Sequence, residues 1–163
     1  MNDIKLKTFK RTYASGGGMY SLDIYLAVYN VENLQTGIYK YQPISNSLLF
    51  KKEIADLDDF IVTSRYCEKT GNYQKIENLL PSVLFIFTNN FTRPRLKYSE
   101  LSLLLAFVDC GALLQNLSLM TAALSLHFCI WAGFKKTSSE KVLGLDGIQN
   151  HVIMTALLGG KNV

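Results

Sequence analysis

The segment 81–88, Pro-Ser-Val-Leu-Phe-Ile-Phe-Thr, constrains the fold more than any other part of this chain. It is a continuous apolar run made mostly of residues that favour β-structure. A strand that lacks the usual alternation of apolar and polar residues is buried on both faces. We therefore place this segment in the middle of a sheet.

The remaining segments predict short strands and few helices. The pattern over 22–29 and 37–41 indicates strands, and 47–50 continues a hairpin. Apolar residues at helical spacing predict a helix over 54–66, followed by a polar loop over 70–75. Further along we expect a loop over 89–94 and then a long buried helix from an N-cap at Ser99 to Leu126. A strand over 128–131 and a small helix, capped by Ser138 or Ser139 and ending at Gly144, should follow. The last predicted element is a strand over 152–158.

These elements do not alternate as βαβ units, and no repeat is visible. The expected fold class is α+β, with a largely antiparallel sheet flanked by helices. The length of 163 residues corresponds to a single domain over 1–163.

Composition excludes several classes of function. The net charge of +4 is modest and the lysines are scattered, which gives no support to nucleic-acid binding. Cys67, Cys110 and Cys129 are odd in number and have no metal-ligand spacing, so we expect reduced thiols and no metal. The first residues have no apolar core for a signal peptide, and we expect a cytoplasmic protein.

The segment 101–134 is mostly apolar and resembles a membrane span at first sight. Asp109, Gln115, Asn116 and His127 interrupt it, so no polar-free window of about 18 residues survives. We interpret it as a core helix followed by a strand, and we expect no membrane partner.

Three consecutive glycines stand directly before the first predicted strand, in Tyr-Ala-Ser-Gly-Gly-Gly-Met-Tyr over 13–20. Glycine allows the backbone to approach another group closely. Such a loop can present N–H groups to an anion or to the polar edge of a flat ring. A flexible turn near the chain end is the alternative.

Several landmarks follow one another in a specific order. They are the Ser-Gly-Gly-Gly loop, Gly-Ile-Tyr-Lys-Tyr before a proline, Leu-Lys-Tyr over 96–98, Asp-Cys-Gly-Ala-Leu-Leu-Gln-Asn-Leu over 109–117, Ala-Gly-Phe over 132–134, Leu-Gly-Leu-Asp over 143–146 and a closing Leu-Leu-Gly-Gly-Lys. Over about residues 10–161 the chain resembles the SagB-type branch of the FMN-dependent nitroreductase superfamily. These dehydrogenases oxidise azolines to azoles in peptide natural products.

The resemblance implies a flavoprotein that is a homo- or heterodimer, with FMN at the subunit interface. The loop would lie against the polar edge of the flavin. A backbone N–H near Ala132 and Gly133 would point to the flavin N5, and Lys161 would lie near the phosphate. The alternatives are an ordinary turn for Gly133 and a solvated tail residue for Lys161. The residues implied to bind the cofactor are thus Ser15, Gly16, Gly17, Gly18, Ala132, Gly133 and Lys161.

The resemblance also implies a reacting pair, Lys97 and Tyr98; the alternative is a charge at the helix start beside an aromatic residue that only packs. Azoline oxidation needs a proton removed from the α-carbon while a hydride passes to the flavin. A free tyrosine is a poor base at neutral pH, but an adjacent ammonium stabilises a phenolate. A second Lys-Tyr dipeptide at Lys40 and Tyr41 lies in a hairpin arm, where we expect surface residues.

Other polar residues are weaker candidates. Asp109 and Asn116 are two helical turns apart and share a face, where they hydrogen-bond buried backbone or line the flavin pocket; we favour the structural role. His127 is expected to be a core histidine and His151 to be exposed.

Two departures from the family pattern matter. Relatives carry an N-terminal helical part whose Arg-x-Ser element grips the flavin phosphate, whereas only Lys10 and Arg11 are basic just before this loop. Three explanations are open: another chain supplies that part, flavin binding is weak, or the sequence is a fragment of a longer protein. Relatives also have a polar stretch and a histidine in the long helix, where this chain has the apolar residues 101–107 and Ala112.

Three functions follow. The first is an FMN-dependent azoline dehydrogenase that acts on a ribosomal precursor peptide beside a cyclodehydratase. The second is a scaffold subunit that pairs with a complete dehydrogenase chain. The third is a generic nitroreductase that uses a nicotinamide donor.

Overall fold

The computed structural model describes residues 10–67, 69–75 and 80–159. A six-stranded antiparallel sheet has the order β3-β2-β1-β6-β8-β7. The predicted central strand is β6 (Val83–Asn90), which lies inside the sheet between β1 and β8, as expected. The other strands are β1 (Leu22–Val28), β2 (Gly37–Gln42), β3 (Ser47–Lys52), β7 (His127–Trp131) and β8 (Asn150–Gly159).

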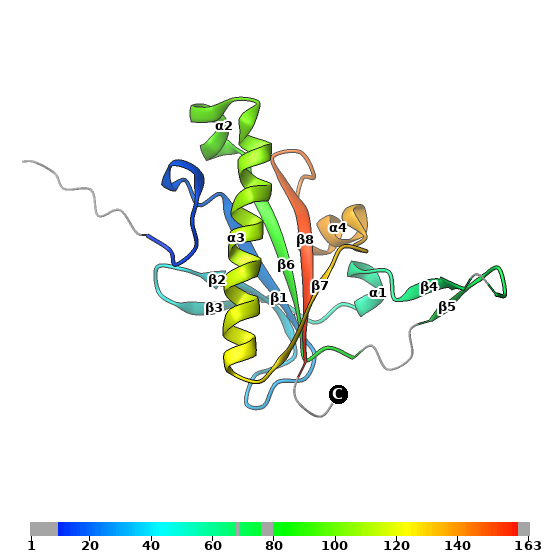
Figure 1. Ribbon diagram of the computed structural model, residues 1–163. Helices are drawn as coiled ribbons and strands as arrows, with labels where there is room; N and C mark the ends of the chain where they lie inside the picture. The colour runs from blue at the N-terminus through cyan, green and yellow to red at the C-terminus, as the bar shows by residue number, and fades with distance from the viewer. Residues whose placement is uncertain (1–9, 68, 76–79, 160–163) are drawn as a thin grey trace, which may run out of the picture.

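Helices cover the sheet on both faces (Figure 1). The long helix α3 (Leu101–Ala123) lies across one face, where Leu113 and Leu114 pack with Leu22 and Phe87 of the sheet. The short helices α1 (Leu57–Phe60) and α4 (Lys136–Leu143) lie on the other face. The α+β class and the largely antiparallel sheet are confirmed.

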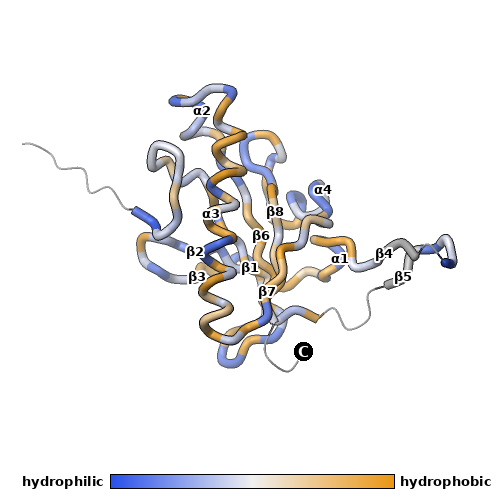
Figure 2. Tube along the Cα trace, in the orientation of Figure 1, coloured by the Kyte–Doolittle hydropathy of each residue, from blue (hydrophilic) through white to orange (hydrophobic). Residues whose placement is uncertain are grey.

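Only one face of α3 is buried in the single chain. Leu104, Val108 and Leu119 are about 60% exposed, at 59%, 60% and 60%. Figure 2 shows apolar residues along the length of the helix. The expectation of a buried helix therefore holds for the sheet-facing side alone, because no part of the described segments 10–67, 69–75 and 80–159 covers the opposite side.

By length and composition α3 also meets the criteria for a membrane-crossing helix, with a mean hydropathy of 1.7 over 18 residues. Core helices of soluble proteins meet the same criteria. In this structure α3 packs on the sheet and its Asp109 is buried, at 3% exposed.

The predicted helix over 54–66 is wrong except for the four residues of α1. Tertiary pairing overrides the helical pattern: Ile61 forms a β-bridge with Phe134, and Phe60 is fully buried. The chain then forms β4 (Ser64–Cys67), which pairs with β5 (Asn72–Lys75) in a hairpin that projects from the body (Figure 1). The expected polar loop over 70–75 is thus mostly strand, because hairpin pairing does not require apolar residues.

The predicted loop over 89–94 and the single helix from Ser99 are also wrong. A separate helix, α2 (Thr92–Tyr98), precedes α3, and Pro94 is tolerated in its first turn, where backbone N–H groups have no helical partner. Ser99 lies between the two helices at φ 47°, ψ −118°, so it ends α2 instead of capping α3. The long helix ends at Ala123, before the predicted Leu126.

The small helix α4 begins before its predicted caps. Lys135 is its N-cap residue, and Ser139 lies inside the helix with its hydroxyl donating to the Phe60 carbonyl at 3.1 Å. Gly144 ends the helix in the left-handed conformation at φ 69°, as predicted. Two histidine predictions were wrong: His127 is exposed on the edge strand β7, and His151 is half-buried against Phe91.

Candidate functional site

The glycine loop is held by one buried carboxylate from α3. The Ser15 hydroxyl donates to Asp109 Oδ2 at 2.5 Å, and the Gly16 N–H donates to Asp109 Oδ1 at 2.9 Å. The Ser15 oxygen in turn accepts from the Tyr20 N–H at 2.9 Å. Asn116, on the same helix face, donates to the Thr12 carbonyl at 3.1 Å. Both side chains thus hydrogen-bond to the segment 12–16, which is consistent with the structural role favoured for them.

The loop uses most of its own N–H groups internally. The Gly18 N–H donates to the Ser15 carbonyl at 3.0 Å, and the Met19 N–H donates to the Gly16 carbonyl at 3.3 Å. Within the described part of the chain, the Gly17 N–H has no hydrogen-bond partner. Among the three glycines of the loop, Gly17 is therefore the one whose N–H has no partner in the described part of the chain.

The loop meets the predicted reacting pair at Gly17. A Cβ atom at this position would lie 1.9 Å from the Tyr98 hydroxyl oxygen and 3.0 Å from Lys97 Nζ. The Lys97 ammonium lies 5.3 Å from the centre of the Tyr98 ring. The structure thus brings together two parts of the predicted site that are about 80 residues apart in sequence. Tyr98 is half-buried and Lys97 is exposed.

A cluster around Arg11 supports the other side of the loop. The Arg11 guanidinium donates to the Leu22 carbonyl at 2.8 Å and to the Tyr13 hydroxyl at 3.1 Å, and it lies 5.4 Å from the centre of the Tyr20 ring. Burial raises the pKa of Tyr13 to about 12, although the neighbouring Arg11 acts in the opposite direction. Sequence analysis missed this role for Arg11, because its partners cannot be inferred from its neighbours in sequence.

A cavity of about 430 Å³ lies beside the loop, with Gly18, Arg11, Asp23 and Lys40 among its lining residues. Lys40 and Asp23 form an ion pair at 2.7 Å. Burial lowers the pKa of Lys40, but its hydrogen bond and charge interaction with Asp23 outweigh burial, and the net shift is upward. Lys40 is therefore half-buried and paired, which corrects the expectation of a free surface residue.

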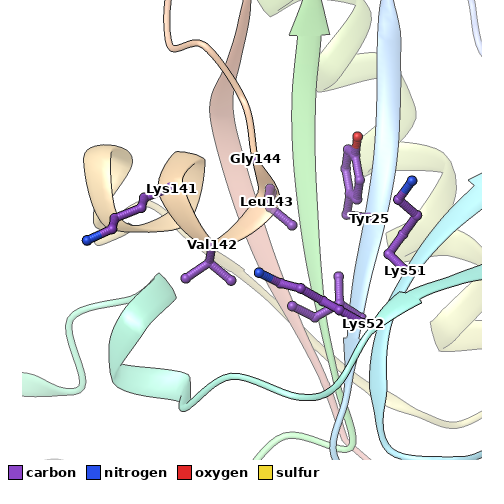
Figure 3. Close-up of a pocket in the computed structure, with 8 residues that line it drawn as sticks. Tyr25, Lys51, Lys52, Lys141, Val142, Leu143 and Gly144 are labelled. Carbon is purple, nitrogen blue, oxygen red and sulfur yellow. The ribbon is translucent and has the colours of Figure 1, made fainter.

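A second cavity, of about 220 Å³, lies on the sheet face that carries α4 (Figure 3). Lys51, Lys52 and Lys141 line it together with Tyr25. It is lined by β1–β3 and α4 and by no residue of the glycine loop, so it belongs to a separate surface.

Of the other predicted cofactor residues, Ala132 and Gly133 do not join the loop within one chain. The carbonyl of Gly133 accepts from the Val62 N–H at 2.6 Å, which places 132–133 with α1, on the face opposite α3. Lys161 lies outside the described residues, and β8 ends at Gly159, which pairs with His127 beyond the far end of α3. From Asp109 to the end of α3 the helix rises roughly 21 Å.

No group of three or more His, Cys, Asp or Glu residues that could hold a metal ion occurs in the described segments 10–67, 69–75 and 80–159. The local chemistry is instead that of a backbone donor, a phenol and an ammonium around one glycine. This arrangement can bind a flat polar-edged group and can accept or donate a proton.

Comparison with known proteins identifies the family of this fold. The nitroreductase family model matches residues 5–160. The microcin B17-processing protein McbC of Escherichia coli is 28% identical over 142 residues, which cover 84% of this chain and 49% of that protein. The chain thus spans about half the length of this curated relative.

Solved structures have the same fold. The E. coli microcin synthetase McbBCD complex with truncated pro-MccB17 bound has a chain that matches with a TM-score of 0.76 and 23% identity, covering 94% of this chain and 57% of that one. A structure called a putative nitroreductase, from Anabaena variabilis, matches with a TM-score of 0.75 and 23% identity over 90% of this chain and 28% of that one. Since the family model covers nearly the whole sequence, this chain belongs to the nitroreductase family.

Proposed function

We propose that this chain is an FMN-dependent dehydrogenase that oxidises thiazolines or oxazolines to thiazoles or oxazoles in a ribosomally made peptide. The observation that carries the proposal is the meeting of the glycine loop with Lys97 and Tyr98 at Gly17. The similarity to McbC, a protein named for processing microcin B17, supports a peptide substrate. The expected setting is cytoplasmic, with a cyclodehydratase and a precursor peptide as partners.

The residues present at the loop fit one edge of a flavin. The Gly17 N–H, which has no partner among the described residues, is a donor for a ring carbonyl or nitrogen. The missing side chain at Gly17 allows the Tyr98 hydroxyl to lie against the backbone of the loop. Ser15, Gly16 and Gly18 would shape this edge of the site. The phosphate would need cations from elsewhere, for which we propose Lys161 and basic residues of a partner chain. When bound, FMN would supply the two-electron oxidant.

The protein's own contribution to the chemistry is proton removal and positioning. The Tyr98 oxygen would take the proton from the substrate carbon, so that the phenolate becomes a phenol. The Lys97 ammonium lies beside this ring, 5.3 Å from its centre, and belongs to the same side of the proposed site. The exposed side of Lys97 leaves room for a peptide to approach from solvent.

A dimer would complete the site. Gly133 and the end of β8 lie far from the glycine loop of the same chain, on the opposite face and beyond the far end of α3. A second chain packed on the exposed side of α3 would bring its own copies of these residues toward this loop. The exposed apolar side chains of α3 provide the surface for such a partner.

The test is reconstitution followed by substitution of the reacting pair. The chain is co-expressed with its cyclodehydratase and precursor peptide, and azole formation is followed by the loss of two mass units per ring. Tyr98→Phe and Lys97→Ala should each lower the rate about 10²- to 10⁴-fold while flavin absorbance is retained. Tyr41→Phe and Lys40→Met serve as matched controls at the second Lys-Tyr dipeptide.

Unchanged oxidation in both site variants would overturn the assignment of the pair. A reconstituted complex without flavin bands would contradict the dehydrogenase and favour the scaffold subunit, for which the unpartnered side of α3 is the supporting observation. Rapid bleaching of bound flavin by a nicotinamide donor, without azole formation, would favour a generic nitroreductase.

A further inference from the structure

We infer that Asp109 is the positioning residue of this site: it fixes the glycine loop so that Gly17 lies against the Tyr98 hydroxyl. The inference concerns the site described above. Only the expected effect of Asp109 on flavin binding and catalysis rests on the proposed function. Its structural part can be tested without substrate.

The argument begins with the two bonds that Asp109 accepts. One carboxylate oxygen binds the Ser15 hydroxyl at 2.5 Å and the other binds the Gly16 N–H at 2.9 Å. Because Asp109 is only 3% exposed, water cannot replace these bonds without rearrangement of the loop.

The second step is the effect of Asp109 on the rest of the loop. The Ser15 hydroxyl gives its hydrogen to Asp109, so its oxygen lone pairs are available to the Tyr20 N–H at 2.9 Å. This closes the loop at both ends around Gly16–Gly18. The internal bonds of Gly18 and Met19 then occupy two more N–H groups. Among Gly16, Gly17 and Gly18, only the Gly17 N–H has no partner in the described part of the chain, and Gly17 has φ 59°.

The third step is the contact across the site. Gly17 lies against the Tyr98 hydroxyl so closely that a Cβ atom would be only 1.9 Å from it. Leu105, on the same helix as Asp109, packs against Gly16, where a Cβ atom would be 3.0 Å from its Cδ2. The α3 helix therefore fixes one wall of the site, and α2 carries the opposing Tyr98. A shift of the loop would change the environment of the phenol directly.

The first experiment is NMR of the full chain with 3-fluorotyrosine and ¹⁵N-glycine. The Tyr98 resonance is assigned with Tyr98→Phe and the Gly17 amide with Gly17→Ala. In Asp109→Asn, where the amide NH₂ can no longer accept the Ser15 hydrogen, both resonances should move. Asn116→Ala is the matched control, because Asn116 holds the neighbouring Thr12 carbonyl and not the loop. Both resonances should stay in place in that variant.

The second experiment measures the flavin complex of the same variants. Loss of one charge-assisted bond from the loop should weaken FMN binding about tenfold in Asp109→Asn and leave it unchanged in Asn116→Ala. Asp109→Ala should have a larger effect, and Asp109→Asn keeps the test decisive if the alanine variant does not fold.

Unmoved Tyr98 and Gly17 resonances in a folded Asp109→Asn variant would overturn the positioning role. Equal shifts in Asp109→Asn and Asn116→Ala would also overturn it, since they would indicate a general effect of loosening the N-terminal segment. The NMR shifts are measured without substrate. A failure of the positioning role can therefore be distinguished from a failure of the proposed dehydrogenase activity, which is measured by azole formation.

Discussion

At the scale of single residues, the site depends on the contrast between Gly17 and its neighbour Gly18. Both have positive φ, at 59° and 65°. A side chain at Gly17 would collide with Tyr98, whereas a Cβ at Gly18 would have no atom within 4 Å. Alanine at Gly18 would therefore introduce backbone strain alone, whereas alanine at Gly17 would introduce the same strain and a clash with Tyr98.

The prediction is that Gly17→Ala and Gly18→Ala differ in activity more than in stability. Each should lower the free energy of unfolding by about 1–2 kcal/mol, because alanine is strained in the left-handed region. Only Gly17→Ala should displace Tyr98, and a misplacement of that kind costs about 100-fold in rate. Urea unfolding and single-turnover azole formation measure the two effects. Equal activity losses would contradict the contact with Tyr98.

Two buried acidic groups make stability depend on alkaline pH. Burial raises the pKa of the Cys110 thiol to about 12, with a smaller contribution from Asp109, and burial raises the pKa of Tyr13 to about 12. Their unfolded values are about 9 and 10. Between those values and 12 the unfolded chain releases protons that the folded chain keeps.

The contribution of these two groups to the free energy of unfolding should therefore be complete below pH 9. The free energy of unfolding should fall as the pH rises from 9 toward 12. Urea titrations at pH 8, 10 and 11 measure this slope. Cys110→Ala and Tyr13→Phe should each flatten it. A slope unchanged by both substitutions would show that other groups control the alkaline range.

At the scale of elements, the junction between α2 and α3 is a point of backbone strain near the site. Ser99 has φ 47° and ψ −118°, and the Ser102 hydroxyl and N–H both donate to its carbonyl, at 2.6 and 3.2 Å. These bonds use the backbone of Ser99 and would survive a change of its side chain. The junction keeps Tyr98 at the end of α2 close to the loop held by α3.

Ser99→Gly should raise the free energy of unfolding by about 1 kcal/mol, since glycine adopts this conformation without strain. Ser138→Gly, inside α4, should lower it by a similar amount, about 1 kcal/mol, because glycine is unfavourable in a helix interior. Chemical denaturation of the two variants checks both signs. A loss of stability in Ser99→Gly would show that the junction is not strained.

At the scale of the whole molecule, α3 has an apolar side that none of the described residues covers. Leu101, Leu104, Val108 and Leu119 are each between 59% and 60% exposed. Surfaces of this kind on soluble proteins are usually interfaces. A second chain there is also what the proposed flavin site requires.

Leu104→Glu combined with Val108→Glu should therefore convert a dimer to a monomer in analytical ultracentrifugation. The free energy of unfolding of the monomer should change by only about 0.5 kcal/mol, since both side chains face outward. Leu80→Glu, at a 74% exposed residue outside α3, is the control and should leave the dimer intact. If the wild-type chain sediments as a monomer alone and as a complex only with a longer relative, the surface on α3 serves a heterodimer instead of a homodimer.

The sequence by itself determined the features that depend on local pattern. The continuous apolar run of β6 specified an interior strand, Gly144 specified the end of α4, and the ordered landmarks specified the family. Tertiary structure decided the rest. Ile61 left the helical pattern because it pairs with Phe134, and the bonds of Asp109 to Ser15 and Gly16 join residues more than 90 positions apart. Such contacts arise only after the sheet and α3 have packed, since no local periodicity encodes which distant backbone a buried carboxylate will satisfy.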